Sequence, residues 1–413
     1  MHRSSTPCSD RRRVRWLGAA LILAALCVFA EGAAFVFYRT VILTGAPFLA
    51  YTPPRDITRV EFERYRRIRD DFLGWPMAYN DPRAEQFDPS GARPSPAFPR
   101  PGDECISLYG DSFVYGSEVS DAETWGNLLS QRVGCRVGNF GVGGYGTDQA
   151  YMRFRRNARD PAPVSILGIY TDNALRNVNQ YRFLLTGVRE EVYGFKPRLV
   201  LEDGRLRLVP LPTLAYDDLA AFFAEPARFL GHEDFLPDTP YGPVRFHFPY
   251  VVSLLRALGK ERARRWLSGV PSSKGFLEPR HPTGSMELTV AIAVAFHDHC
   301  RERGRVCLVV VFPTPSAYQF LAKTGELVTR PIGQALGERG VRVLDLTATL
   351  MRALDGGPLC SVLTQPVKCR SHFNAEGNRL IAQLVYDYLG REGLLPGPRT
   401  QDRRGAGTPH QSS

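Results

Sequence analysis

A serine and a histidine, far apart in this 413-residue chain, are of the types needed for nucleophilic catalysis. Ser112 stands in the stretch 110–113 (Gly-Asp-Ser-Phe), directly after the apolar run 106–109. A serine hydroxyl needs a neighbouring base before it attacks a carbonyl carbon. His372 is the candidate for that base. By itself an Asp-Ser pair after a strand is most often a helix cap, so the rest of the chain must decide.

Two further stretches could stabilise the negative charge that forms when a serine attacks a carbonyl group. The first is the glycine-rich turn 139–146 (Asn-Phe-Gly-Val-Gly-Gly-Tyr-Gly), which offers backbone N–H groups. The second is the pair Asp172 and Asn173, just after the strand-like run 164–170. Sites of open parallel sheets form at the carboxyl ends of the strands. All of these residues are therefore expected at one edge of a sheet.

Together, these stretches resemble the blocks of the SGNH, or GDSL-type, hydrolase family. The first, second, third and fifth blocks correspond to residues 110–113, 139–144, 167–177 and 372–377, in the family's order over residues 103–392. The resemblance implies a three-layer α/β/α flavodoxin-like fold with a parallel sheet. It also implies ester or acyl-transfer chemistry with neither a cofactor nor a metal.

The resemblance further implies a role for each site residue. Ser112 is the expected nucleophile and His372 the expected base. The Ser112 N–H, Gly144 and Asn173 are the expected oxyanion donors. Counting from the start of the second block selects Gly144, with Gly143 as the alternative.

The chain departs from the family pattern in two places. Its third block reads Asp172-Asn173 in place of Asn-Asp, so Asn173 is the expected oxyanion donor and Asp172 the alternative. The family usually has an aspartate three residues before the histidine, where this chain has Cys369. Three alternatives follow: a Ser–His dyad oriented by a backbone carbonyl, an acid from elsewhere, or an inactive site. Asp345, at the end of a predicted strand, is the first candidate acid, although a strand-end turn residue is the simpler interpretation.

The N-terminus predicts a membrane segment. Arginines at 11–13 and 15 precede an apolar run over 16–30, which resumes after Glu31 as far as Tyr38. About 20 such residues span a bilayer core, and the positive flank should stay in the cytoplasm. We therefore predict a single-pass membrane protein whose catalytic domain is extracytoplasmic, in the bacterial periplasm or at the cell surface. The alternative is a signal peptide cleaved after residues 28–30 (Val-Phe-Ala).

Cysteine and charge patterns agree with an exported enzyme. Six cysteines follow the N-terminal segment, at positions 105, 135, 300, 307, 360 and 369. In an oxidising compartment they permit disulfides, including a local pair such as Cys360 with Cys369. None has the C-x2-C spacing typical of zinc sites, so no metal is expected. The formal charge of +10 comes mainly from arginine and accompanies no nucleic-acid-binding motif, so no nucleic-acid partner is expected.

The chain divides into four predicted parts. Residues 1–38 form the cytoplasmic N-terminus and anchor, 39–102 a membrane-proximal lead-in and linker, 103–396 the hydrolase-like domain, and 397–413 a disordered tail. Alternating strand and helix patterns in 103–396 indicate a parallel sheet covered on both faces. An insertion at 181–280 interrupts them, with a hairpin signal at Asp203-Gly204. It either covers the site or decorates one edge of the domain.

These observations predict an extracytoplasmic serine esterase acting on acyl esters, such as O-acetyl groups of an envelope or exported saccharide. Its partners would be an acylated small molecule or saccharide, and the membrane. The alternatives are an O-acyltransferase that uses the same residues and a non-catalytic binding protein that keeps the fold.

Overall fold

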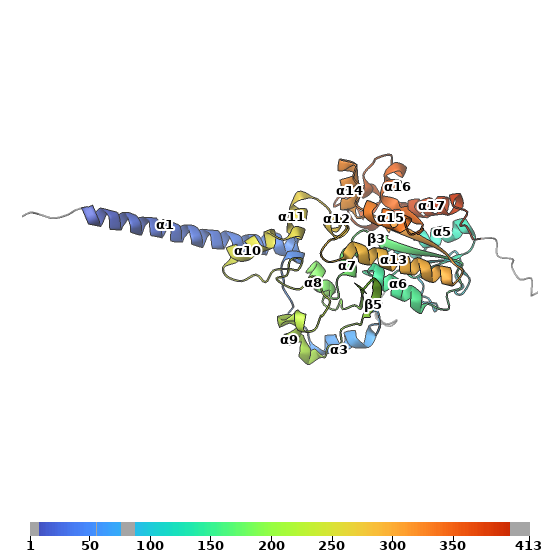
Figure 1. The fold of residues 1–413 in the computed structure, drawn as a ribbon, viewed down its shortest axis with the longest axis horizontal. Coiled ribbons are helices and arrows are strands. Elements are labelled where there is room, and N and C mark those ends of the chain that lie inside the picture. The colour runs from blue at the N-terminus through green and yellow to red at the C-terminus, as the bar shows by residue number, and fades with distance from the viewer. Residues whose placement is uncertain (1–7, 55, 76–86, 397–413) are drawn as a thin grey trace, which may run out of the picture.

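The computed structural model describes residues 8–54, 56–75 and 87–396. Its centre is a five-stranded parallel sheet of order β2-β1-β3-β6-β7 (Figure 1). The strands are β1 (Glu104–Tyr109), β2 (Arg136–Asn139), β3 (Val164–Tyr170), β6 (Val306–Phe312) and β7 (Val343–Asp345). Numbered along the chain, this is the 2-1-3-4-5 order of flavodoxin-like folds. The expected three-layer α/β fold is confirmed. The predicted tail at 397–413 lies outside the described residues.

Helices cover both faces of this sheet because its strands are apolar on both sides. Leu167 and Val309 face one core, shared with α6 (Thr147–Arg156), α13 (Ser285–Glu302) and α15 (Arg330–Gly337). Ile166 and Leu308 face the other core. The helices on that side are α5 (Trp125–Val133), α14 (Pro315–Thr324), α16 (Leu346–Ala353) and α17 (Ala375–Arg391). The alternation of successive strand residues between two cores produces the three layers.

Residues 250–268 form two helices, α10 (Tyr250–Leu258) and α11 (Glu261–Ser268), because α10 ends at Gly259. His372 lies in the short strand β9 (Arg370–Phe373). This strand pairs antiparallel with β8 (Leu363–Gln365).

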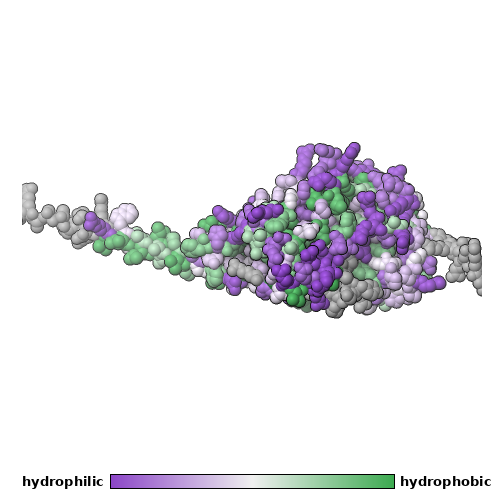
Figure 2. Space-filling view, turned by 90° about the horizontal axis from the view of Figure 1, so that it is seen from below, coloured by the Kyte–Doolittle hydropathy of each residue, from purple (hydrophilic) through white to green (hydrophobic). Residues whose placement is uncertain are grey.

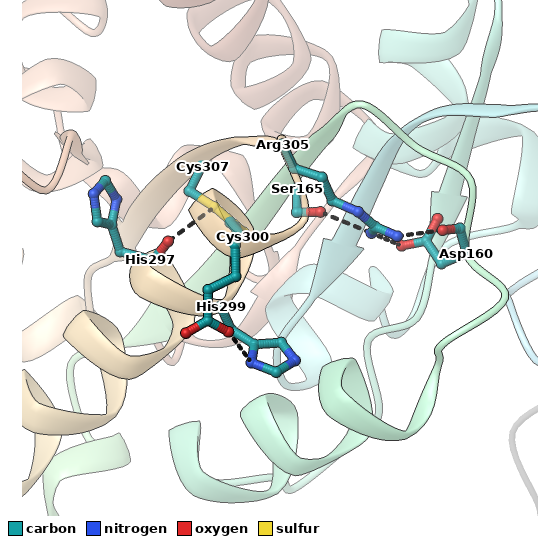
Figure 3. Close-up of a disulfide and its surroundings, with 8 residues drawn as sticks. Asp160, Ser165, His297, His299, Cys300, Arg305 and Cys307 are labelled. Atoms are coloured by element: carbon teal, nitrogen blue, oxygen red, sulfur yellow. Dashed lines mark hydrogen bonds and ion pairs between the residues drawn. A yellow bond between two sulfur atoms is a disulfide. The ribbon is translucent and has the colours of Figure 1, made fainter.

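Three disulfides join elements of the domain, as the cysteine count permitted. They link Cys105 to Cys135, Cys300 to Cys307 and Cys360 to Cys369. The second ties the end of α13 to the start of β6, beside Arg305, which contacts Asp160 and Ser165 (Figure 3). The third disulfide is the local pair expected from the sequence, and it lies next to β9, the strand that contains His372.

The insertion contains a hairpin and a series of short helices. The hairpin pairs β4 (Arg198–Glu202) with β5 (Arg205–Val209), and Asp203 and Gly204 turn with φ of 48° and 73°, as predicted. The helices besides α10 and α11 are α8 (Arg182–Thr186), α9 (Leu219–Ala224) and α12 (Ser272–Phe276). Ahead of the domain, α3 (Arg59–Ile68) forms within the predicted lead-in.

The N-terminal segment is one long helix that projects from the domain (Figure 1). It comprises α1 (Cys8–Phe37), a π-helical turn η1 (Tyr38–Ile42) and α2 (Leu43–Gly45). Its stretch from Arg13 to Gly45 is long and apolar enough to cross a membrane, although a signal sequence would have the same properties. Figure 2 shows the apolar surface of this helix, which ends where the more hydrophilic domain begins.

Candidate active site

Ser112 lies at the carboxyl end of β1, as the first residue of the short helix α4 (Ser112–Tyr115). Asp111 caps this helix, since its Oδ1 accepts the Phe113 N–H at 2.9 Å. Gly110 is required just before them, because a Cβ there would lie 2.3 Å from Val114 Cγ2. The Asp-Ser pair is therefore a helix cap, and it also holds a 7% exposed serine at the edge of the sheet.

One guanidinium connects three of the expected site stretches. The Nη1 atom of Arg176 donates to Asp111 Oδ2 at 2.8 Å, to the Tyr145 carbonyl at 3.0 Å and to Asn173 Oδ1 at 3.2 Å. Burial raises the pKa of Asp111, and the charge of Arg176 opposes that shift. Arg176 thus fixes the first, second and third blocks relative to one another.

Asn173 presents an unpaired donor inside the protein. It is the first residue of α7 (Asn173–Asn177) and is fully buried. Arg176 occupies its side-chain oxygen, and its Nδ2 has no hydrogen-bond partner in the described part of the chain. A buried donor without an acceptor costs about 1–3 kcal/mol. Asn173 therefore retains an unused N–H donor, whereas Asp172, at the N-cap of α7, offers a carboxylate.

Gly144 lies in a tight turn beside the Gly-Asp-Ser stretch. The Val142 N–H donates to the Gly110 carbonyl at 3.1 Å, and Gly144 has φ of 77°, a conformation that favours glycine. The Trp75 Nε1–H donates to the Gly143 carbonyl at 2.7 Å. Because the C=O and N–H of a trans peptide point in opposite directions, the Gly144 N–H faces away from Trp75. This orientation is fixed by the protein before any substrate binds.

His372 lies beside α4, the helix that begins with Ser112, and has a carboxylate partner. Its ring centroid is 5.0 Å from that of Phe113, the residue after Ser112. Its Nδ1 lies 3.0 Å from Glu118 Oε1. A hydrogen bond from Nδ1–H to a carboxylate leaves Nε2 as the nitrogen that can accept the serine proton.

Glu118 is a site residue that the sequence did not reveal. It lies in the loop after α4 and has φ of 72°. Its carboxylate also accepts hydrogen bonds from Ser371 Oγ and Thr364 Oγ1. Partial burial favours the neutral form, but the hydrogen bonds from Ser371, Thr364 and His372 outweigh it and lower the pKa of Glu118. The carboxylate is therefore ionised at neutral pH.

The structure does not place Asp345, the first candidate acid, on the histidine. Asp345 ends β7 and caps α16, accepting the Thr347 N–H at 2.7 Å on Oδ1 and the Thr329 hydroxyl on Oδ2. Its position fits the simpler interpretation of a strand-end residue. Cys369, in the family's usual acid position, is bonded to Cys360. The carboxylate that contacts the histidine comes instead from the loop that follows α4.

The described residues contain no group of three or more His, Cys, Asp or Glu side chains arranged to hold a metal ion. What the site does contain is a histidine paired with a glutamate beside the helix that begins with Ser112, and an asparagine whose amide donor is unpaired. This arrangement is suited to acyl chemistry at a carbonyl carbon.

Comparisons with known proteins give only distant likenesses. No family model matches the sequence, and no curated protein does. Similar solved structures include a putative lipolytic protein of the G-D-S-L family from Desulfitobacterium hafniense DCB-2, at 13% identity and a TM-score of 0.32, covering 68% of this chain and 97% of that one. A member of the lipolytic protein G-D-S-L family from Veillonella parvula DSM 2008 has 12% identity and a TM-score of 0.33, with coverages of 69% and 98%. The acetyl xylan esterase AlAXEase has 11% identity, a TM-score of 0.33 and the same coverages.

These identities and TM-scores are low. The fold class therefore rests on the strand order of the sheet, and the description of the site rests on its own geometry.

Proposed function

We propose that this protein is a membrane-anchored, extracytoplasmic serine esterase. The observation that carries the proposal is the hydrogen bond between Glu118 and His372 beside the helix of Ser112. A missing acid was the reason to consider a non-catalytic protein. Glu118 removes that reason.

The proposed reaction has two acyl-transfer steps. The Ser112 oxygen attacks the ester carbonyl while His372 Nε2 takes its proton, and Glu118 stabilises the imidazolium. The side-chain amide of Asn173 and the N–H groups of Gly144 and Ser112 hold the oxyanion. His372 then protonates the leaving alcohol. Water attacks the acyl-serine in the same way, releasing the acid and restoring the Ser112 hydroxyl.

The proposed location rests on the N-terminal helix and the disulfides. The apolar stretch from Arg13 to Gly45 can cross a bilayer, and the arginines before it favour a cytoplasmic N-terminus. Three disulfides are typical of an oxidising compartment. The catalytic domain would then meet substrates outside the cytoplasm, and an O-acetylated envelope or exported saccharide is the first substrate class to test.

The test is an esterase assay on the full-length protein in detergent. Short acyl esters and an acetylated saccharide are offered to the wild type, to Ser112→Ala and to the control Ser361→Ala, which removes an exposed hydroxyl. We expect Ser112→Ala to lower kcat by at least about 10⁴-fold and Ser361→Ala to retain activity. Equal rates for the wild type and Ser112→Ala would contradict the proposal and favour a binding protein.

The same assay separates hydrolysis from acyl transfer. A sugar hydroxyl can replace water in the second step with no change in the catalytic residues. The ratio of released acid to acylated sugar, measured with a saccharide acceptor present, decides between esterase and O-acyltransferase.

A further inference from the structure

Several large apolar side chains are exposed close to where the N-terminal helix joins the domain. Two belong to α10, one precedes it and one belongs to α11. They are Phe248 (71% exposed), Val252 (43%), Leu255 (65%) and Leu267 (60%). Clustered exposed apolar side chains commonly mark a surface for a protein or membrane partner.

The helix α10 is fixed against the N-terminal helix. Glu31 Oε2 accepts the Tyr250 N–H at 2.6 Å, at the first turn of α10. The rings of Phe35 and Tyr250 meet edge to face at 5.0 Å, and Tyr38 stacks on Phe246 at 4.2 Å. Figure 1 shows α10 alongside the domain end of α1. Glu31, an unexpected charge in an apolar helix, therefore has a structural role as a helix cap.

A second contact makes this junction rigid. A small buried core forms from the end of the N-terminal helix, the residues after it and α11; its fully buried members are Ile42, Ala46, Leu49, Ala50 and Ala263. Arg262 of α11 donates to the Leu185 carbonyl at 2.8 Å and lies over the Phe48 ring. The insertion thus holds α10 and α11 in a set position relative to α1.

The length of α1 sets the depth of α10. Sixteen residues separate Arg15 from Glu31, which is about 24 Å along a helix. A bilayer core is about 30 Å thick. If Arg15 marks the cytoplasmic boundary, Glu31 and the first turn of α10 lie within the outer part of the bilayer.

We propose that α10 forms a second membrane contact, which inserts Phe248, Val252 and Leu255 into the outer leaflet. The inference rests on the membrane span included in the proposed function. The inward side of α10 is provided by Ser253 and Ala257, which are buried. Arg256 and Arg264 are exposed, and their charged side chains can bind anionic lipid headgroups at the surface of the bilayer.

This contact would hold the catalytic domain at a fixed height and tilt. The helix α12, which follows α11, packs against α7, the helix that begins with Asn173. The insertion would therefore connect the membrane surface to the oxyanion side of the site.

The test uses the full-length protein in vesicles of phosphatidylethanolamine and phosphatidylglycerol. Cys8→Ser and Cys27→Ser leave only the disulfide-bonded cysteines, and one new cysteine at a time carries the fluorophore NBD. The test position is Leu255→Cys. Leu21→Cys on α1 is the membrane control, and Val367→Cys, at a 99% exposed position, is the water control. Near-ultraviolet circular dichroism checks that each labelled protein is folded.

We expect nitroxide-labelled lipids to quench NBD at positions 21 and 255 at least about two-fold more than at position 367. Quenching at 21 but not at 255 would overturn the second contact while leaving the anchor intact. If neither position is quenched, the anchor itself is absent and the inference is overturned with it. A blue-shifted but lipid-insensitive signal at 255 would indicate contact with a second copy of the chain, and would also overturn it.

Discussion

The Oε1 atom of Glu118 lies 3.0 Å from Nδ1 of His372, across 254 positions of sequence. The acid and the nucleophile of the proposed triad therefore belong to one short segment, because Glu118 follows Ser112 by only six positions. The place before His372 where the family usually has an acid instead holds Cys369, whose disulfide secures the start of β9. The loop after α4 and the disulfide thus share the task of orienting the histidine.

The unpaired amide of Asn173 predicts a loss of transition-state binding when it is removed. Asn173→Ala should lower kcat by about 10²–10³-fold, the usual effect of deleting one oxyanion donor, with little change in KM. Asn177→Ala is a matched control on the same helix, because Asn177 donates to Thr289 Oγ1 at 2.9 Å and has a structural partner. That variant should lower the Tm more than kcat. Equal kcat values for the two variants would argue against an oxyanion role.

The disulfide beside His372 should matter for activity more than a distant one does. Replacing Cys360 and Cys369 with alanine removes a disulfide that should stabilise the folded protein by about 2–3 kcal/mol. It also removes the covalent constraint at the start of β9. We expect kcat to fall in this variant. The Cys300→Ala/Cys307→Ala variant, at the other end of the sheet, should lose stability but keep kcat once folded. The readouts are kcat and the denaturant midpoint of both variants.

A buried ion pair supports α7, the helix that begins with Asn173, because Lys196 Nζ donates to the Arg176 carbonyl at 3.2 Å. Lys196 Nζ lies 2.6 Å from Asp148 Oδ2, both side chains are fully buried, and the ammonium also donates to the Asn179 carbonyl. Lys196→Met leaves the buried Asp148 carboxyl without its cationic partner, so it should reduce the free energy of unfolding by about 3–5 kcal/mol. Adding Asp148→Asn removes the unpaired carboxyl and should recover part of the loss in urea unfolding. An unchanged midpoint for Lys196→Met would refute this account.

The lowered pKa of Glu118 predicts an acid-dependent contribution to stability. A carboxyl group whose pKa is lower in the folded state contributes fully above its ordinary value, here 4.5, and loses that contribution as the pH falls through the lowered pKa. The gap in unfolding free energy between the wild type and Glu118→Gln should be constant near neutral pH and shrink below about pH 4.5. Urea unfolding across that pH range measures it. If the difference in unfolding free energy instead grows as the pH falls, the pKa of Glu118 is raised in the folded state and the prediction is wrong.

Local patterns were sufficient to predict much of this molecule. The strand at 164–170 and the hairpin at Asp203-Gly204 were predictable because apolar runs and turn residues determine them within a few positions. The position of the candidate residues at one edge of the sheet was predictable because the carboxyl ends of parallel strands lie at the same edge. Glu118 was not, since its contact with His372 depends on tertiary packing and follows no spacing rule. The docking of α10 on α1 was hidden for the same reason, although Glu31 was already conspicuous in the apolar run.

The central claim is that His372, supported by Glu118, activates Ser112. The most direct measurement is the rate at which a fluorophosphonate probe modifies Ser112, followed by mass spectrometry in the wild type, Glu118→Gln and Asp345→Asn. The account predicts labelling of Ser112 in the wild type, an unchanged rate in Asp345→Asn and a rate at least about 100-fold lower in Glu118→Gln. Labelling of another serine, or an equal rate in Glu118→Gln and the wild type, would contradict it.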